Sequence, residues 1–464
     1  MTPSKEFAPN NTPYEPLIAD AASGNFTFDS LHKRVPHILT DIINDLYAAI
    51  QEYKGDNVEA AVSEGKALTS ALSKLKHEMV TDKQLTAIEE DGVGDTAVWN
   101  AWLATYFPSA TWYTAPFLAW EPYMYRRIAS TFRRSEHWKA YDFFAGKKQS
   151  TFMASMVAVA KLCSRVDALT SACKADSGNA TKMHLAFVEM LQASLWGNQT
   201  DLSMFPDLSN EALEEMQARI SSGENDSKIV SNDTERIWRL VSRIKGGRID
   251  IVLDNSGFEL LQDVLLAHWL VELGVAAKVV FHTKRIPWYV SDVTDADFHW
   301  LVAVAQDPSA ANIRAPPSQA DVDALGRLGA KWAGFLADGT WELKDELFWT
   351  GPYGFRYLPT IGKDVWDGEL TKADIVIFKG DLNYRKLTYD LKWPVSTPFA
   401  AALGPIATDA NAPAIVALRT SKCDTITGVA PERAEALFSE REDWMYSGLY
   451  GVIQLSPGRW SDSI

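Results

Sequence analysis

Oxygen-bearing side chains follow two apolar, β-branched runs in the second half of the chain. The run RIDIVLD ends in Asp254, which precedes Asn255, and the run AKVVFHTKR leads to Ser291 and Asp292. Carboxylates that face one another without a counter-ion repel each other, and each raises the pKa of the other. A divalent cation resolves this conflict, and oxygen ligands without His or Cys favour Mg²⁺, Mn²⁺ or Co²⁺ over zinc. These side chains therefore predict a metal site.

Charged residues follow two further runs of the same kind. The run ADIVIFKG continues into Asp381, Arg385 and Lys386, and the run APAIVALRT ends close to Arg419 and Lys422. Active sites for phosphoryl transfer commonly combine fixed cations with a metal held by carboxylates, because both stabilise charge on phosphate oxygens. The pattern predicts a phosphate-binding site. Each part also has a structural interpretation, because Asp and Asn commonly cap helices and basic residues are common surface charges.

The order of elements explains why these side chains should meet. The β-branched runs alternate with stretches of helical spacing, such as SGFELLQDVLLAHWLVELG, which predicts an α/β fold with a mainly parallel, Rossmann-like sheet and helices on both faces. Ligands of such sheets bind at the carboxyl ends of the strands. Residues 30–220 mostly repeat the helical period, and the polar run at 221–233 predicts a loop. We therefore predict a mostly helical region over 1–232, which contributes one wall of the cleft, and an α/β/α domain over 233–464, which carries the site.

The composition is that of a folded, acidic protein. The 464 residues include 45 Lys and Arg against 60 Asp and Glu, a net charge of −15, which argues against non-specific binding of nucleic acid. Three cysteines without a C-x-x-C pair fit a reducing compartment. We expect no membrane segment and an intracellular location, in the cytoplasm with the nucleus as a second compartment. The sequence indicates no particular protein partner.

Four motifs of the second half carry a resemblance. They are LDNSGFELLQDVLLAHWL, KRIPWYVSDV, FKGDLNYRKLTYD and LRTSKCD, and the earlier segments PFLAWEPYMYRRI and LWGNQTDLS accompany them. Together they resemble the domain-of-unknown-function 89 family, the metal-dependent damage-control phosphatases, over residues 20–456. The last motif fits the R-T-x-K signature of the subfamily of acidic-residue methyltransferase 1-like proteins.

The resemblance implies an active site between the helical region and the α/β/α core. It implies that Asp254, Asn255 and Asp292 bind the metal and, with Lys422, perform catalysis. It further implies that the substrate meets Asp381, Asn383, Tyr384, Arg385 and Lys422. Glu259 matches a position that the family links to an S-adenosylmethionine site.

The implied activity is hydrolysis of small phosphorylated metabolites, such as fructose 1-phosphate and related sugar phosphates, with Mn²⁺, Co²⁺, Ni²⁺ or Mg²⁺. Two nucleophiles stay open, a water activated by the metal and Asp254 itself. An acidic protein that acts on anions needs a locally positive cleft, which Arg126 could help to supply. The alternative for Arg126 is a salt bridge between the two regions.

The alternative activity is that of an S-adenosylmethionine-dependent protein-glutamate carboxyl O-methyltransferase, which is also attached to this family. Doubly wound methyltransferases usually carry a glycine-rich turn directly after the first strand, whereas DNSG follows the run RIDIVL in this chain. Methyl transfer also gains little from a carboxylate-held divalent ion, whereas cleavage of a phosphate ester gains much. The phosphatase is therefore the favoured prediction.

Overall fold

A computed structural model of the chain describes residues 14–18, 26–197, 227–308 and 318–463. Residues 221–226 of the loop predicted at 221–233, and the segment LWGNQTDLS beyond its glycine, lie outside the described residues. None of the described helices is both long and apolar enough to cross a membrane.

The centre of the molecule is a seven-stranded sheet in the order β1-β7-β6-β5-β2-β3-β4. All neighbours pair in parallel except β6 and β7, which are antiparallel. The predicted α/β class with a mainly parallel sheet is thus confirmed. Along the sheet, the strands are β1 (Ile229–Asn232), β7 (Gly451–Ser456), β6 (Ala414–Thr420), β5 (Ile375–Lys379), β2 (Gly247–Val252), β3 (Ala276–His282) and β4 (Trp341–Lys344).

Two edge strands were absent from the prediction. β1 falls inside the stretch predicted as a loop, and β4 lies in a segment without a β-branched run. Both have four residues and pair with one neighbour, so a short stretch such as Ile229–Asn232 needs few apolar side chains to form a strand. The loop prediction was therefore wrong over β1.

Helices cover both faces of the sheet. Ile249 and Ile251 of β2 pack toward one group of helices and Val252 toward the other, as the alternation of a strand requires. The first group is α6 (Ala145–Ala154), α7 (Met156–Ala175), α8 (Ala180–Trp196), α10 (Thr234–Val241), α11 (Phe258–Glu272), α12 (Asp295–Gln306) and α13 (Gln319–Asp338). The second is α15 (Gly380–Thr388), α16 (Phe399–Leu403), α17 (Pro405–Thr408) and α18 (Pro431–Glu440), with the short α14 (Lys363–Trp366).

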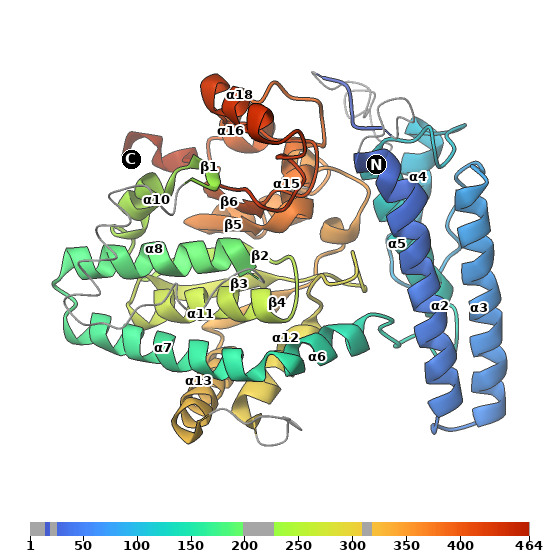
Figure 1. Ribbon diagram of the computed structural model, residues 1–464, viewed down its shortest axis with the longest axis horizontal. Coiled ribbons are helices and arrows are strands. Elements are labelled where there is room, and N and C mark those ends of the chain that lie inside the picture. Colours follow the sequence, from blue (N-terminus) through green and yellow to red (C-terminus); the bar gives the residue numbers. More distant parts are fainter. Residues whose placement is uncertain (1–13, 19–25, 198–226, 309–317, 464) are drawn as a thin grey trace.

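The first helices of the chain form a separate group beside the sheet, at the right of Figure 1, which we call the helical lobe. It consists of α1 (Phe26–Asp29), the π-helical turn η2 (Ser30–Arg34), α2 (Val35–Glu52), α3 (Val58–Val80), α4 (Thr96–Tyr106) and α5 (Phe117–Arg133). Its core includes Trp288 and Leu382 from the α/β part, which join the lobe to the carboxyl edge of the sheet.

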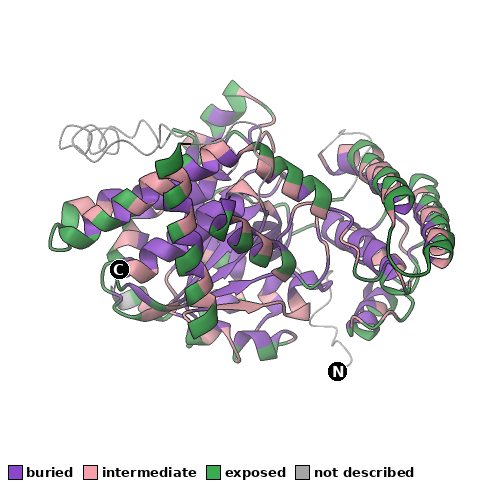
Figure 2. Ribbon diagram, turned by 90° about the horizontal axis from the view of Figure 1, so that it is seen from below, coloured by how far each residue is buried: buried purple, intermediate pink, exposed green. Residues whose placement is uncertain are grey.

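Buried residues gather in the sheet and along the inner sides of the helices, whereas the outer sides of the helices are exposed (Figure 2). The helical prediction for the N-terminal half holds for α2 and α3, whose buried residues recur at helical spacing. The predicted division at 232/233 stays a prediction, and the described packing places α6, α7 and α8 against the sheet.

Candidate active site

Backbone contacts join the tips of β2 and β3. The N–H of Val293 donates to the carbonyl of Asp254 at 2.8 Å, and an isolated antiparallel bridge pairs Asn255 with Asp292. Because the two strands are parallel neighbours, their carboxyl ends lie at the same edge of the sheet. The structure therefore brings the three predicted metal ligands to one place.

The loop after β3 reaches this place through an unusual backbone. Tyr289 has a φ of 44° and Val290 a φ of 72°. Both values lie in the left-handed region, which is costly for a residue other than glycine and most of all for the β-branched Val290. The ring of Tyr289 stacks on that of Tyr125 in α5, with the centroids 4.6 Å apart. The helical lobe thus holds the loop that delivers Ser291 and Asp292.

Hydrogen bonds fix the amide of Asn255. Its Nδ2 donates to Oδ2 of Asp254 at 2.7 Å and to Oε2 of Glu259 at 2.9 Å, and its Oδ1 accepts from the hydroxyl of Ser291. Glu259 in turn lies 3.7 Å from Nζ of Lys379. Because two carboxylates hold the nitrogen, the amide oxygen is the atom that Asn255 can offer to a cation.

The positive charge around the two buried aspartates does not compensate for the effect of their burial. Burial, followed by repulsion from Asp292 and Glu259, raises the pKa of Asp254 well above its usual range. Burial raises the pKa of Asp292 to about 7, although Lys284 opposes the shift. Nζ of Lys284 lies 3.4 Å from Oδ2 of Asp292, an oxygen that accepts no hydrogen bond from the described residues. A divalent cation would supply the missing charge, so this donor set fits a metal.

Gly380 allows the tip of β5 to approach Asp254. Its φ is 80°, and a Cβ at this position would lie 1.8 Å from Oδ2 of Asp254. Any other residue would therefore collide with the carboxylate and would also need an unfavourable backbone conformation. Helix α15 begins at this glycine and carries the next predicted residues into the site.

The predicted alternative, that these residues cap helices, does not fit the structure. Thr294 caps α12 and forms a capping box with Asp297, and the residue at the cap position of α11 is Gly257. Asp292 and Asp254 are therefore not used as caps, and their carboxylates stay available at the edge of the sheet.

Asp381 organises the tip of β6. It accepts from Nε of Arg419 at 2.7 Å and from the backbone N–H of Lys422 at 3.0 Å. Burial would raise the pKa of Asp381, but attraction to Arg419 and Arg385 and the hydrogen bonds that the carboxylate accepts together outweigh it, so the pKa is lowered. The guanidinium of Arg419 also lies over the ring of Tyr384, 4.4 Å from its centroid. Arg419 is thus engaged by the protein, whereas the side chain of Lys422 is exposed at the site.

Three further predicted substrate residues on α15 are bound within the protein. Asn383 donates to three backbone carbonyls, and the hydroxyl of Tyr384 forms a hydrogen bond with a buried threonine. Arg385 is 3% exposed and binds Asp390 at 2.8 Å and Glu121 at 3.0 Å. These residues hold the walls of the site together.

A cavity of about 400 Å³ lies between the edge of the sheet and the helical lobe. Its lining includes six predicted site residues, Asp254, Asn255, Asp292, Asp381, Arg385 and Lys422, and Phe26, Arg34, Glu121, Tyr289, Ser291, Leu382 and Tyr446 complete it. The predicted residues Glu259, Asn383 and Tyr384 do not line the cavity, because each is buried behind it.

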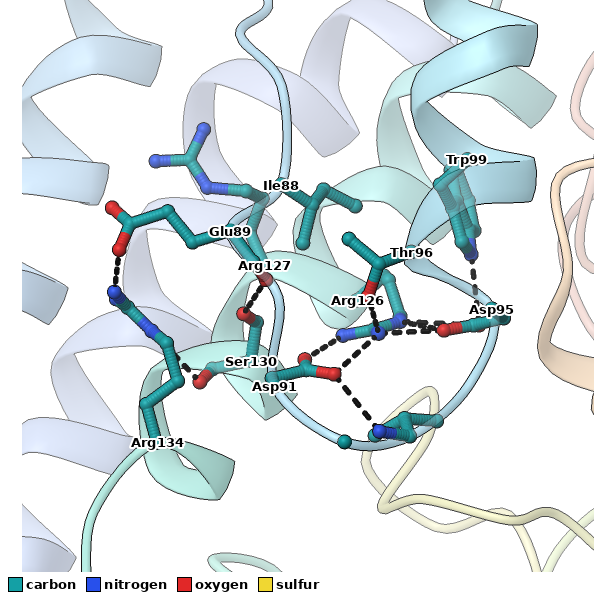
Figure 3. Close-up of polar contacts among 12 residues, drawn as sticks. Ile88, Glu89, Asp91, Asp95, Thr96, Trp99, Arg126, Arg127, Ser130 and Arg134 are labelled. Carbon is teal, nitrogen blue, oxygen red and sulfur yellow. Dashed lines mark hydrogen bonds and ion pairs between the residues drawn. The ribbon is translucent and has the colours of Figure 1, made fainter.

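Arg126 does not reach this cavity, which corrects the prediction that it meets the substrate. Its guanidinium is completely buried in the helical lobe and pairs with Asp91 at 2.5 Å and with Asp95 at 2.6 Å (Figure 3). A buried guanidinium needs such partners, and both lie in the segment before α4. The alternative prediction was a salt bridge between the two regions. Arg126 does form ion pairs, but both partners belong to the helical lobe.

The lining residues that were absent from the prediction include Phe26, Arg34, Tyr289 and Tyr446. Phe26 and Arg34 lie in one N-terminal helical stretch, whereas Tyr289 and Tyr446 lie far along the chain in irregular segments, so no spacing connects the four. A local signal near Arg34 is Pro36, two residues later, which has no N–H to donate to a helical hydrogen bond.

Among the described residues, one group of three His, Cys, Asp or Glu side chains has ligand atoms within 4.8 Å of one another. It consists of Glu64, Glu136 and His137 of the helical lobe, none of which lines the cavity. The candidate active site combines two aspartates with an asparagine, a different donor set.

The fold and the cavity define an α/β protein whose candidate active site lies at the carboxyl edge of a mostly parallel sheet. The chain belongs to the damage-control phosphatase ARMT1-like family, because the model of that domain matches residues 30–437. The predicted family and the prediction of a phosphatase enzyme are thereby confirmed.

Similar proteins cover nearly the whole chain. A mouse protein named Damage-control phosphatase ARMT1 is 35% identical over 93% of this chain and 96% of its own length. A Xenopus tropicalis protein of the same name is 36% identical over 93% of this chain and 97% of its own length. The crystal structure of a DUF89 family protein from Pyrococcus horikoshii aligns with 86% of this chain and 93% of its own, at 15% identity and a TM-score of 0.34.

Proposed function

We propose that the protein is a metal-dependent phosphatase that hydrolyses small phosphorylated metabolites, with fructose 1-phosphate and related sugar phosphates as candidate substrates. The observation that carries this proposal is the pair of buried, under-compensated aspartates with Asn255 in a cavity that Lys422 also lines. A cavity of about 400 Å³ falls in the range of small-molecule sites.

In this proposal Asp254, Asn255 and Asp292 hold the metal. When bound, a divalent ion of this kind polarises the phosphoryl group and makes water a stronger nucleophile at neutral pH. Asp381 fixes the backbone at Lys422, so that the ammonium can bind phosphate oxygens as charge develops on them. Ser291 and Glu259 keep the amide of Asn255 in one orientation.

Two routes remain for the attack on phosphorus. In one, water attacks the phosphorus atom, an aspartate of the site accepts its proton, and the ester P–O bond breaks, so that the sugar leaves as an alcohol after its oxygen takes up a proton. In the other, a carboxylate oxygen of Asp254 attacks and the sugar leaves in the same way, and water then cleaves the aspartyl phosphate to release inorganic phosphate and free Asp254. Rapid quenching with ³²P-labelled substrate distinguishes the routes, because only the second leaves label on the protein.

The test of the proposed function is release of inorganic phosphate from a panel of sugar phosphates, in chelator and with Mn²⁺, Co²⁺, Ni²⁺ or Mg²⁺. The panel is run with the wild type, with Asp254→Ala, and with Asp367→Ala as the control. Asp367 has a side chain that is 54% exposed and does not line the cavity. Metal-dependent release that only Asp254→Ala loses would support the proposal. Folded wild type that releases no phosphate with any of the metals would overturn it.

Methyl transfer from S-adenosylmethionine remains the alternative, and titration with that cofactor would follow a negative result. No contact in the site favours it over the phosphatase. Glu259, the residue connected with that cofactor by resemblance, is engaged by Asn255 and lies close to Lys379. The intracellular location stays a prediction.

A further inference from the structure

The helical lobe brings one cation to the cavity through an unusual turn. Ser30–Arg34 form a π-helical turn, in which the N–H of Val35 donates to the carbonyl of Ser30, five residues earlier. Pro36 follows and has no N–H, so the regular ladder is interrupted at this point. Such turns are rare and are often found at functional sites. Here the turn ends at Arg34, a residue of the cavity lining.

Arg34 is held at one side and open at the other. Its Nη2 binds Oε1 of Glu121, a carboxylate with no exposed surface, whereas the side chain of Arg34 is 42% exposed. The burial of Glu121 keeps the guanidinium in place. The remaining N–H groups of a guanidinium held in this way can donate to a molecule in the cavity.

The second guanidinium of the cavity has no such freedom. Arg385 binds Glu121 and Asp390, and its guanidinium carbon lies 4.0 Å from the centroid of the Phe117 ring. Its side chain is 4% exposed. Of the two arginines that share Glu121, Arg34 is therefore the one that can bind a ligand.

The position of Arg34 indicates which part of a ligand it meets. The predicted metal ligands lie on the sheet side of the cavity, whereas Arg34 and Phe26 come from the helical lobe on the other side. The rings of Phe26 and Tyr446, both in the lining, lie 5.7 Å apart and offer an apolar surface beside it. A phosphate ester whose phosphoryl group lies at the sheet therefore turns its remaining part toward Arg34.

The local charge favours a neutral, oxygen-rich group over a second anion. Arg34 and Arg385 carry two positive charges, and Glu121 and Asp390 carry two negative charges, so the four groups together are neutral. A second phosphate would meet no net positive charge, whereas hydroxyl and carbonyl oxygens need only N–H donors.

We propose that Arg34 is a specificity-determining residue that donates hydrogen bonds to hydroxyl or carbonyl oxygens of the sugar part of a sugar phosphate. This proposal rests on the proposed function, because it assumes that the phosphoryl group lies at the edge of the sheet. It assigns to the helical lobe the recognition of what the phosphate is attached to.

The test compares kcat/KM for phosphate esters whose organic part increases in size, namely glycerol 3-phosphate, a pentose phosphate and hexose phosphates. The variants are Arg34→Gln and Arg34→Lys. The matched control is Lys33→Gln, because Lys33 lies in the same turn, has a 74% exposed side chain and pairs with Asp29. Thermal melting shows whether each variant is folded.

We expect Arg34→Gln to lower kcat/KM for hexose phosphates by roughly 10- to 100-fold, the effect of one charge-assisted hydrogen bond, mainly through KM. The loss for glycerol 3-phosphate should be under about threefold. For hexose phosphates, kcat/KM of Arg34→Lys should lie between that of the wild type and that of Arg34→Gln, because an ammonium keeps the positive charge but lacks the planar set of N–H donors. Lys33→Gln should match the wild type.

An equal loss on all esters, or no loss on hexose phosphates, would overturn the proposal, because the first result describes a structural role and the second describes no role. If Arg34→Gln does not fold, the ratio of hexose to glycerol phosphate activity in Arg34→Lys decides in the same way. Wild-type protein that hydrolyses none of the esters would instead refute the proposed function, so the two failures are distinguishable.

Discussion

Asp292→Asn should stabilise the protein in the absence of metal while it abolishes phosphatase activity. The pKa of Asp292 is about 7 in the folded protein, mainly because of burial, against about 3.9 in an unfolded chain. A carboxyl group with a raised pKa contributes stability that is complete below the unfolded value and is lost as the pH rises through the folded value. The ionised Asp292 is therefore destabilising above pH 7.

The size of this effect follows from the two pKa values. Each pH unit between them changes the free energy of unfolding by about 1.4 kcal/mol, so the cost is roughly 4 kcal/mol at pH 8 and roughly 1 to 2 kcal/mol at pH 5. The neutral amide of Asn carries no such cost. In chelator, the variant should therefore exceed the wild type by up to these amounts, with the larger difference at pH 8.

The assay is urea denaturation in chelator at both pH values, repeated with saturating metal. The matched control is Asp297→Asn, because Asp297 is also buried but binds Lys148 at 2.6 Å and two groups of Thr294. Loss of these bonds should destabilise the control by about 1 to 3 kcal/mol. Metal should stabilise the wild type and not Asp292→Asn. If Asp292→Asn were less stable than the wild type at pH 8 in chelator, this would refute the inference that the ionised Asp292 lacks a sufficient counter-charge in the metal-free protein.

Two other substitutions separate the site from the scaffold. Lys422→Ala should lower kcat on a sugar phosphate by about 10²- to 10³-fold without a change in melting temperature, since its exposed ammonium binds phosphate oxygens in the proposed mechanism; an unchanged kcat would contradict this role. Arg126→Met should cost about 3 to 5 kcal/mol in urea denaturation, because Asp91 and Asp95 would lose their buried counter-charge. A loss below about 1 kcal/mol would contradict the assigned ion pairs.

The sequence was sufficient for the class of fold, and it predicted the place of the candidate site. Strands β2, β3, β5, β6 and β7 are short β-branched runs, and their alternation with helical stretches implies a parallel sheet whose carboxyl ends share one edge. Asp254 and Asn255 follow β2 closely and Asp292 lies at the end of the loop after β3, so local pattern and topology predicted that the three would lie near one another. The edge strands β1 and β4 were missed because a four-residue strand with one neighbour has too little pattern to recognise.

Only the tertiary structure decided which charged side chains are available to a ligand. Arginine is a residue type that binds anions, but Arg126, Arg385 and Arg419 are all buried. Each forms an ion pair with a carboxylate that lies in another part of the sequence. A buried charge must find a partner, and that partner is chosen by packing, which periodicity does not record. The same packing leaves Lys422 exposed and brings Arg34 from the first helices to the cavity, on the side opposite the sheet. The sequence therefore predicted where the candidate site lies, and the fold decided which charged residues there are free to meet a ligand.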